Sequence, residues 1–169
     1  MPSEEVIEVD KLDKNFKYEI AKEPGGESLM YCFQCGTCTA ACPVSPKKDS
    51  FNPRQLIHMA LMGMRDEVLS DEFVWYCSGC YACQERCPQG VTITYLMTAL
   101  RNIAYRSGKG VQAHKEVIKK IAAKGWLNDI GEFDNEMRQK LGLPPITQKG
   151  EEPDKVLKAS GAKKLAGGE

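Results

Sequence analysis

Cysteine is the residue type in this chain whose number and spacing indicate chemistry. All eight cysteines lie in two short blocks, CFQCGTCTAACP from Cys32 to Pro43 and CSGCYACQERCP from Cys77 to Pro88. Both blocks have the spacing C-x2-C-x2-C-x3-C-P. Cysteines form disulfides, bind zinc or bind iron–sulfur clusters, so the spacing must decide between three chemistries.

Disulfide frameworks are typical of small secreted domains, whereas this chain has 169 residues and an acidic N-terminus without the layout of a signal peptide. Structural zinc takes four ligands, commonly from two C-x2-C pairs, and requires neither the third cysteine of a block nor the proline after the fourth. Cysteines at positions i, i+3 and i+6 allow one tight loop to bind three corners of an iron–sulfur cube. We therefore interpret the blocks as ligands of two [4Fe-4S] clusters, with zinc and disulfides as alternatives.

The fourth cysteine of such a block binds the other cluster when two blocks share a fold. The first cluster is then expected on Cys32, Cys35, Cys38 and Cys87. The second is expected on Cys77, Cys80, Cys83 and Cys42. Four ligands for each cluster use all the cysteines, which leaves no thiolate for thiol–disulfide exchange and no iron corner open to substrate. The chain is therefore predicted to carry electrons without a catalytic residue of its own.

Residues between and before the cysteines indicate how the clusters are surrounded. Small or polar residues allow backbone amides and hydroxyls to approach the sulfurs and tune the reduction potential: Gly36, Thr37, Ser78 and Gly79. Aromatic residues precede both blocks, where they either shield the clusters or pack in an ordinary core: Tyr31, Trp75 and Tyr76.

The elements that position the cysteines are predicted to be helices. Between the blocks, Asn52 can cap a helix that begins at Pro53 and ends before Gly63, and Ser70 can cap a short helix that leads into the second block. After Pro88, Thr92 can cap a helix that ends before Gly108, with Ile93, Leu96, Met97, Leu100, Ile103 and Ala104 on one face. Phe16, Tyr18 and Ile20 alternate as in a strand, but Phe16 and Ile20 also lie one helical turn apart, which favours a short helix there. Further helices are expected at residues 111–124 and 134–141.

Composition excludes several classes of function. Lys and Arg total 23 and Asp and Glu total 23, so no basic surface for nucleic acid is expected. No apolar run approaches the ~18 residues of a transmembrane helix, which predicts a cytoplasmic protein with no membrane span. The glycine-rich dinucleotide fingerprint is absent, so we expect no flavin on this chain.

The block from Cys32 to Pro43 closely resembles that of HdrC, the small iron–sulfur subunit of heterodisulfide reductase. The resemblance continues through Asn52-Pro-Arg54 and from Trp75 to Pro88, is looser at Lys140–Pro145, and covers about residues 28–145. It implies an all-α fold, the alpha-helical ferredoxin with two [4Fe-4S] clusters, followed by extra C-terminal helices. The resemblance implies an electron-transfer subunit, which in that family receives electrons from the flavin-bearing HdrA and passes them to HdrB. The coenzyme M–coenzyme B heterodisulfide (CoM-S-S-CoB) is reduced on HdrB.

The resemblance therefore implies two partners, an HdrA-like flavoprotein and an HdrB-like protein with CCG motifs. This chain contains no Cys-Cys-Gly, so the disulfide chemistry is expected in a partner. The alternative is the iron–sulfur subunit of a fumarate reductase, succinate dehydrogenase or glycolate oxidase, whose helical ferredoxin domains are similar. Such dehydrogenase subunits usually begin with a plant-type [2Fe-2S] domain, whereas residues 1–28 contain no cysteine.

Four segments are expected along the chain. Residues 1–28 form an N-terminal extension, and residues 29–107 form the ferredoxin domain. Residues 108–145 form the C-terminal helices. Residues 146–169 form a tail that is either frayed or docks a partner.

Overall fold

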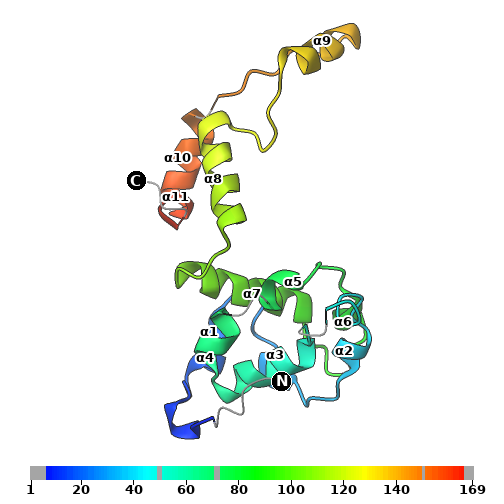
Figure 1. Cartoon of the computed structure of the whole chain (residues 1–169), viewed down its shortest axis with the longest axis vertical. Helices are drawn as coiled ribbons and strands as arrows, with labels where there is room; N and C mark the ends of the chain where they lie inside the picture. Colours follow the sequence, from blue (N-terminus) through cyan, green and yellow to red (C-terminus); the bar gives the residue numbers. More distant parts are fainter. Residues whose placement is uncertain (1–6, 49–50, 71–72, 150, 166–169) are drawn as a thin grey trace. The chain divides into compact units, whose positions relative to one another are not determined.

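The computed structural model describes residues 7–48, 51–70, 73–149 and 151–165, and every regular element within them is a helix. This confirms the all-α fold class expected from the sequence. The chain divides into two compact units, residues 1–109 and residues 110–169, which we call unit 1 and unit 2 (Figure 1). All eight cysteines belong to unit 1.

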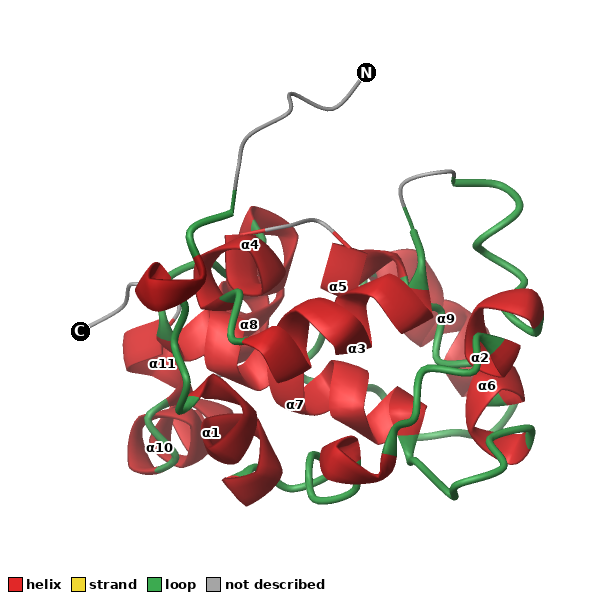
Figure 2. Cartoon of the chain, turned by 90° about the horizontal axis from the view of Figure 1, so that it is seen from below, coloured by secondary structure: helices red, strands yellow, loops and turns green. Residues whose placement is uncertain are grey.

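Unit 1 contains two longer helices, α3 and α7, against which shorter elements pack (Figure 2). Helix α3 contacts α1, α2 and α4, and helix α7 contacts α1, α4, α5 and α6. In chain order the elements are η1 (Val9–Lys11), α1 (Phe16–Lys22), η2 (Leu29–Tyr31), α2 (Thr37–Ala40), α3 (Pro53–Met62), α4 (Arg65–Ser70), α5 (Phe73–Tyr76), α6 (Ala82–Glu85) and α7 (Ile93–Arg106).

Helix α3 begins and ends where the sequence predicts. The Asn52 side chain accepts a hydrogen bond of 3.0 Å from the backbone N–H of Gln55, and Pro53 occupies the first helical position. Gly63 ends the helix in the left-handed conformation, with φ at 88°. A Cβ atom at this glycine would lie 2.3 Å from the carbonyl oxygen of Asp13, so no larger residue fits.

The core of unit 1 consists of apolar side chains at helical spacing. The predicted face of α7 is buried along its whole length, at Ile93, Leu96, Met97, Leu100, Ile103 and Ala104. Helix α3 contributes Leu56, Ile57 and Ala60. On α1, Phe16 and Ile20 have no exposed surface, so this N-terminal helix is part of the same core.

Two predictions about helix capping are wrong. Ser70 does not begin a helix: it is the last residue of α4, and its hydroxyl donates to the carbonyl of Asp66 one turn earlier. Thr92 does occupy the position before α7, but its side chain does not cap the helix. Its hydroxyl is hydrogen-bonded to that of Ser28 at 2.9 Å, so it joins the start of α7 to the segment before the first cysteine.

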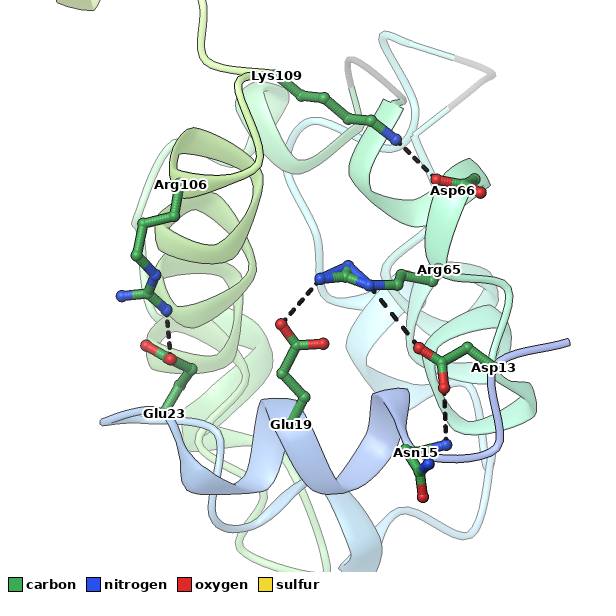
Figure 3. A network of polar contacts seen from close by, with 8 residues as sticks. All are labelled: Asp13, Asn15, Glu19, Glu23, Arg65, Asp66, Arg106 and Lys109. Carbon is green, nitrogen blue, oxygen red and sulfur yellow. Dashed lines mark hydrogen bonds and ion pairs between the residues drawn. The ribbon is translucent and has the colours of Figure 1, made fainter. Parts of the chain in front are cut away.

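Charged side chains connect α1 to α4 and α7 at the surface of unit 1 (Figure 3). The guanidinium group of Arg65 lies 2.9 Å from the carboxylate of Glu19 and 3.8 Å from that of Asp13. Arg106 on α7 pairs with Glu23 just after α1. Partly exposed pairs of this kind contribute about 0–1 kcal/mol each, so the buried apolar side chains account for most of the stability.

Unit 2 consists of α8 (Gln112–Lys124), α9 (Glu132–Lys140), α10 (Glu151–Ala159) and α11 (Ala162–Leu165). The sequence predicts the first two of these helices, whereas α10 and α11 lie in the segment expected to be a tail. Both contact α8. No described residue of unit 2 is fully buried. In the described part of the whole chain, no helix has the length and apolarity needed to cross a bilayer.

Candidate metal centres

The eight cysteines line two separate cavities in unit 1. Set 1 consists of Cys32, Cys35, Cys38 and Cys87, which line one cavity. Set 2 consists of Cys42, Cys77, Cys80 and Cys83, which line the other. Each cavity therefore collects three cysteines of one motif and the fourth cysteine of the other.

The two cysteine loops share one backbone conformation around their second cysteine. The residues on either side of Cys35 are left-handed, with φ of 64° at Gln34 and 86° at Gly36. The residues on either side of Cys80 are left-handed too, with φ of 67° at Gly79 and 63° at Tyr81. A left-handed non-glycine residue costs about 1 kcal/mol or more and persists where surrounding structure enforces it, commonly at functional sites.

A short helix follows each loop and carries its third cysteine. Helix α2 carries Cys38 and helix α6 carries Cys83, and both side chains are buried. The two helices contact each other, which brings the motifs together although 34 residues separate Cys42 from Cys77 (Figures 1 and 2). Contact between α2 and α6 therefore places the end of each motif beside the beginning of the other.

Three sulfurs of set 1 have hydrogen-bonding neighbours. The amide nitrogen of Gln34 donates to the Cys32 sulfur at 3.4 Å, and the Thr37 hydroxyl lies 3.3 Å from the Cys35 sulfur. The backbone N–H of Val91 donates to the Cys87 sulfur at 3.3 Å. Set 2 has the Thr94 hydroxyl 4.0 Å from the Cys83 sulfur.

One arginine accompanies each loop. Arg54, at the start of α3, donates to the backbone carbonyl of Gln34 at 3.0 Å. Arg101, on α7, donates to the carbonyls of Val74 at 2.6 Å and Cys77 at 2.7 Å. These bonds hold the backbone of each loop, at Gln34 in the first and at Cys77 in the second, and place a positive charge beside it.

Burial and hydrogen bonding change the acidity of individual thiols. Burial raises the pKa of Cys38 and of Cys83 above the ordinary value for a thiol. The hydrogen bond with the Thr37 hydroxyl lowers the pKa of Cys35, whose side chain is exposed. Only a thiolate binds metal, so occupation of either cavity by iron releases protons from these cysteines.

The residues present fit two iron–sulfur clusters. All eight cysteines are free thiols. Within the described residues, no three Cys, His, Asp or Glu side chains converge closely enough to hold one metal ion, and the sulfurs instead surround the two cavities. A [4Fe-4S] cluster takes four thiolates and is tuned by hydrogen bonds to sulfur, and each cavity offers four thiols with donors beside them.

Several contributors to the site were missed by the sequence analysis, among them Val91 and Arg101, whose contacts depend on the fold, and also Gln34 and Thr94. Gln34 could have been noticed, because it lies between two cysteines. The role of Thr94 depends on how α7 packs against α6, so no local pattern reveals it. Of the polar residues that the sequence did single out, Thr37 does contact a sulfur, whereas Ser78 lines the second cavity without a hydrogen bond to sulfur among the described residues. Tyr31 is 63% exposed and does not belong to the core.

Comparison with known proteins agrees with this geometry. Residues 28–91 match the family of 4Fe-4S dicluster domains. The helical fold and the two four-thiol cavities therefore define a two-cluster iron–sulfur protein of the ferredoxin type.

Comparison over nearly the whole chain narrows this class to one family. The C subunit of the H(2):CoB-CoM heterodisulfide,ferredoxin reductase of Methanothermobacter thermautotrophicus is 40% identical over 97% of this chain and 91% of its own length. The iron–sulfur C subunit of the CoB–CoM heterodisulfide reductase of Methanopyrus kandleri is 34% identical over 98% and 93%. The C subunit of the ferredoxin:CoB-CoM heterodisulfide reductase of Methanosarcina mazei is 39% identical over 73% and 75%. The chain belongs to the family of iron–sulfur C subunits of heterodisulfide reductase.

Proposed function

We propose that this chain carries electrons between two partner proteins of a heterodisulfide reductase complex. An HdrA-like flavoprotein supplies the electrons, and an HdrB-like protein with CCG motifs receives them and reduces the disulfide. The relatives are named for the heterodisulfide of coenzymes B and M, which is the substrate we propose for the complex. The observation that carries this proposal is the pair of cavities, each lined by four cysteines.

The proposed ligands of one cluster are the cysteines of set 1, and those of the other cluster are the cysteines of set 2. The lining of the cavities supports this assignment, because the fourth cysteine of each motif faces the cavity of the other motif. A bound [4Fe-4S] cluster supplies one-electron redox chemistry. Since all eight sulfurs serve as ligands, the chain keeps no nucleophile for the disulfide, and both the flavin and the substrate belong to its partners.

One residue of α7 contributes to both sites. Ile93, the first residue of α7, lines both cavities and is only 2% exposed. The two sites therefore share one buried apolar side chain. The second cysteine of each motif, Cys35 or Cys80, is exposed, whereas the third is buried. Each site thus has one sulfur at the protein surface, where a partner's redox centre can approach.

Metal content and spectroscopy test the proposal first. The chain purified without oxygen is expected to contain about eight iron and about eight sulfide per molecule, and to give two distinguishable paramagnetic centres on reduction. Zinc in place of iron, or a protein that cannot be loaded with iron and sulfide, would refute it.

A reconstituted complex tests the direction of electron transfer. Reduced flavoprotein is mixed with the CCG-motif protein and the heterodisulfide, with and without this chain, and thiol formation is measured. We expect thiols to form only when the loaded chain is present. The matched control is the double variant Cys35→Ala/Cys80→Ala, which removes one proposed ligand from each set and changes no other residue. Equal thiol formation without the loaded chain contradicts the proposed role.

A further inference from the structure

The two cysteine motifs differ in the hydrogen-bond donors that they place beside sulfur. When the blocks are compared position by position from their first cysteine, Gln34 corresponds to Gly79 and Thr37 corresponds to Ala82. Gln34 and Thr37 both contact sulfurs of set 1. Gly79 and Ala82 have no polar side-chain atom to offer to set 2. The backbone at these positions is nevertheless alike, because Gln34 and Gly79 have φ of 64° and 67°.

Where the structure describes them, the segments after the fourth cysteines also offer a donor to set 1 and none to set 2. Val91 is four residues after Cys87, and its backbone N–H donates to that sulfur at 3.3 Å. The residue four positions after Cys42 is Pro46, which has no N–H group. Three sulfurs of set 1 therefore have a donor from these positions, and the corresponding positions give set 2 none.

The contacts of set 2 in the described part of the chain involve one sulfur, that of Cys83, which has the Thr94 hydroxyl and the backbone N–H groups of Cys83 and Gln84 as neighbours. The Thr94 hydroxyl lies 4.0 Å from the Cys83 sulfur, at the long limit for a hydrogen bond to sulfur. Ser78 also lines the second cavity, but it is exposed and forms no hydrogen bond to a sulfur in the described part of the chain. Among the described residues, hydrogen-bonding neighbours therefore reach one sulfur of set 2, that of Cys83, and at least three sulfurs of set 1.

Two other features that adjust the potential of a cluster, exposure of the cysteines and an arginine bonded to the loop, are similar at the two sites. In each set one cysteine is exposed, one is buried and two are intermediate, so exposure to solvent does not separate them. The buried members, Cys38 and Cys83, are 8% and 9% exposed. Each loop also has one arginine bonded to its backbone, Arg54 in the first and Arg101 in the second. Hydrogen bonding to sulfur is the feature that differs.

We propose that Gln34 and Thr37 are positioning residues that give the set 1 site a higher reduction potential than the set 2 site, an inference that rests on the proposed function. Reduction adds negative charge to a cluster and its sulfurs. Because a metal-bound thiolate carries no proton, the Thr37 hydroxyl must be the donor in its contact with Cys35. Donors directed at sulfur stabilise the added charge, which raises the potential. At equilibrium, a single electron on the chain resides mainly at set 1.

Redox titration followed by electron paramagnetic resonance tests this inference on the full chain. The wild-type protein is expected to show two centres with separate midpoint potentials. Thr37→Val, which removes the hydroxyl but keeps the shape, lowers the higher potential. We expect about a tenfold change in the ratio of oxidised to reduced centre at a fixed potential, or about 59 mV for one electron. Gln34→Gly, which introduces the residue of the second motif, shifts the same centre in the same direction.

The reciprocal substitution tests the corresponding position in the second motif. Ala82→Thr introduces a hydroxyl at the position that matches Thr37, and we expect it to raise the lower potential and leave the higher one unchanged. Thr37→Ser keeps a donor and is expected to restore most of the wild-type potential. Thr98→Val is the control, because the Thr98 hydroxyl donates to the carbonyl of Thr94 and not to a sulfur.

The outcomes separate this inference from the function on which it rests. Opposite shifts of two different centres in Thr37→Val and Ala82→Thr support the inference. A wild-type chain with two loaded centres, whose lower-potential centre is the one that responds to Thr37→Val, overturns the inference and leaves the electron-transfer function standing. Unchanged potentials in both Thr37→Val and Ala82→Thr also overturn the inference and leave the electron-transfer function standing. A wild-type chain that binds no cluster overturns both.

Discussion

Replacement of Cys87 by alanine tests how the two motifs share their ligands. Cys87 belongs to the second motif in sequence, yet its side chain lines the cavity of Cys32, Cys35 and Cys38. If the fourth cysteine crosses between motifs, Cys87→Ala removes one of the four ligands at set 1 and none at set 2. One cluster then loses its ligand at one iron, so the iron content falls from about eight to about seven if a three-iron cluster persists, or to about four if the cluster is lost.

The assay compares spectra of single variants, each loaded with iron and sulfide under the same conditions. We expect Cys87→Ala to alter the same paramagnetic centre as Cys35→Ala, and Cys80→Ala to alter the other one. Cys42→Ala is the reciprocal control and is expected to affect the same centre as Cys80→Ala. If Cys87→Ala and Cys80→Ala alter one common centre, each motif binds its own cluster and the proposed ligand sets are wrong.

Three further predictions concern the scaffold of unit 1. Gly63→Ala is expected to lower the free energy of unfolding by more than about 1 kcal/mol in urea titration, because a Cβ there meets the Asp13 carbonyl at 2.3 Å in a left-handed residue. Gly108→Ala, also left-handed but with open space around it, should cost less. Asn52→Ala removes the cap of α3 and should cost about 1 kcal/mol in the same assay, whereas Asn52→Asp, which keeps the capping oxygen, should cost less. A chain ending at residue 109 should still bind about eight iron atoms, because unit 1 contains every cysteine.

Each of these predictions has a clear contrary result. Equal losses for the two glycine variants would mean that backbone strain, and not the contact with the loop before α1, determines the cost. An unchanged free energy in Asn52→Ala would mean that water satisfies the first turn of α3 equally well. The sequence predicts that the ferredoxin domain ends near residue 107. Loss of iron from the shortened chain would contradict this limit and show that unit 2 is needed to hold the clusters.

Local patterns predicted the helices well where one residue type determines the conformation. Pro53 at a helix start and Gly63 at its end are such residues, and α3 has those limits. The spacing of Leu96, Leu100 and Ile103 likewise predicted the buried face of α7. Serine and threonine proved less reliable, because their hydroxyls can bond in several directions.

Thr92 and Thr94 show why the rest of the site could not be predicted. Thr92 bonds to Ser28, which is 64 positions away in the chain, and Thr94 approaches the Cys83 sulfur only because α7 packs against α6. These contacts depend on the assembled fold and leave no signal at helical spacing. The conformation of Gln34 could not be predicted either. A non-glycine residue adopts a φ of 64° only when neighbouring structure requires it. The ligand sets themselves remain a prediction until the cysteine variants are measured.

Sharing of ligands between motifs makes the two sites dependent on each other. With the proposed sets, neither motif alone supplies four sulfurs, so either cluster requires both loops to be folded and α2 to contact α6. Ile93 strengthens this dependence, since one buried side chain forms part of both cavities. The segment between the motifs must therefore fold before or together with cluster binding. Within that segment, α3 is capped by Asn52 and buries Leu56, Ile57 and Ala60 in the core that it shares with α7.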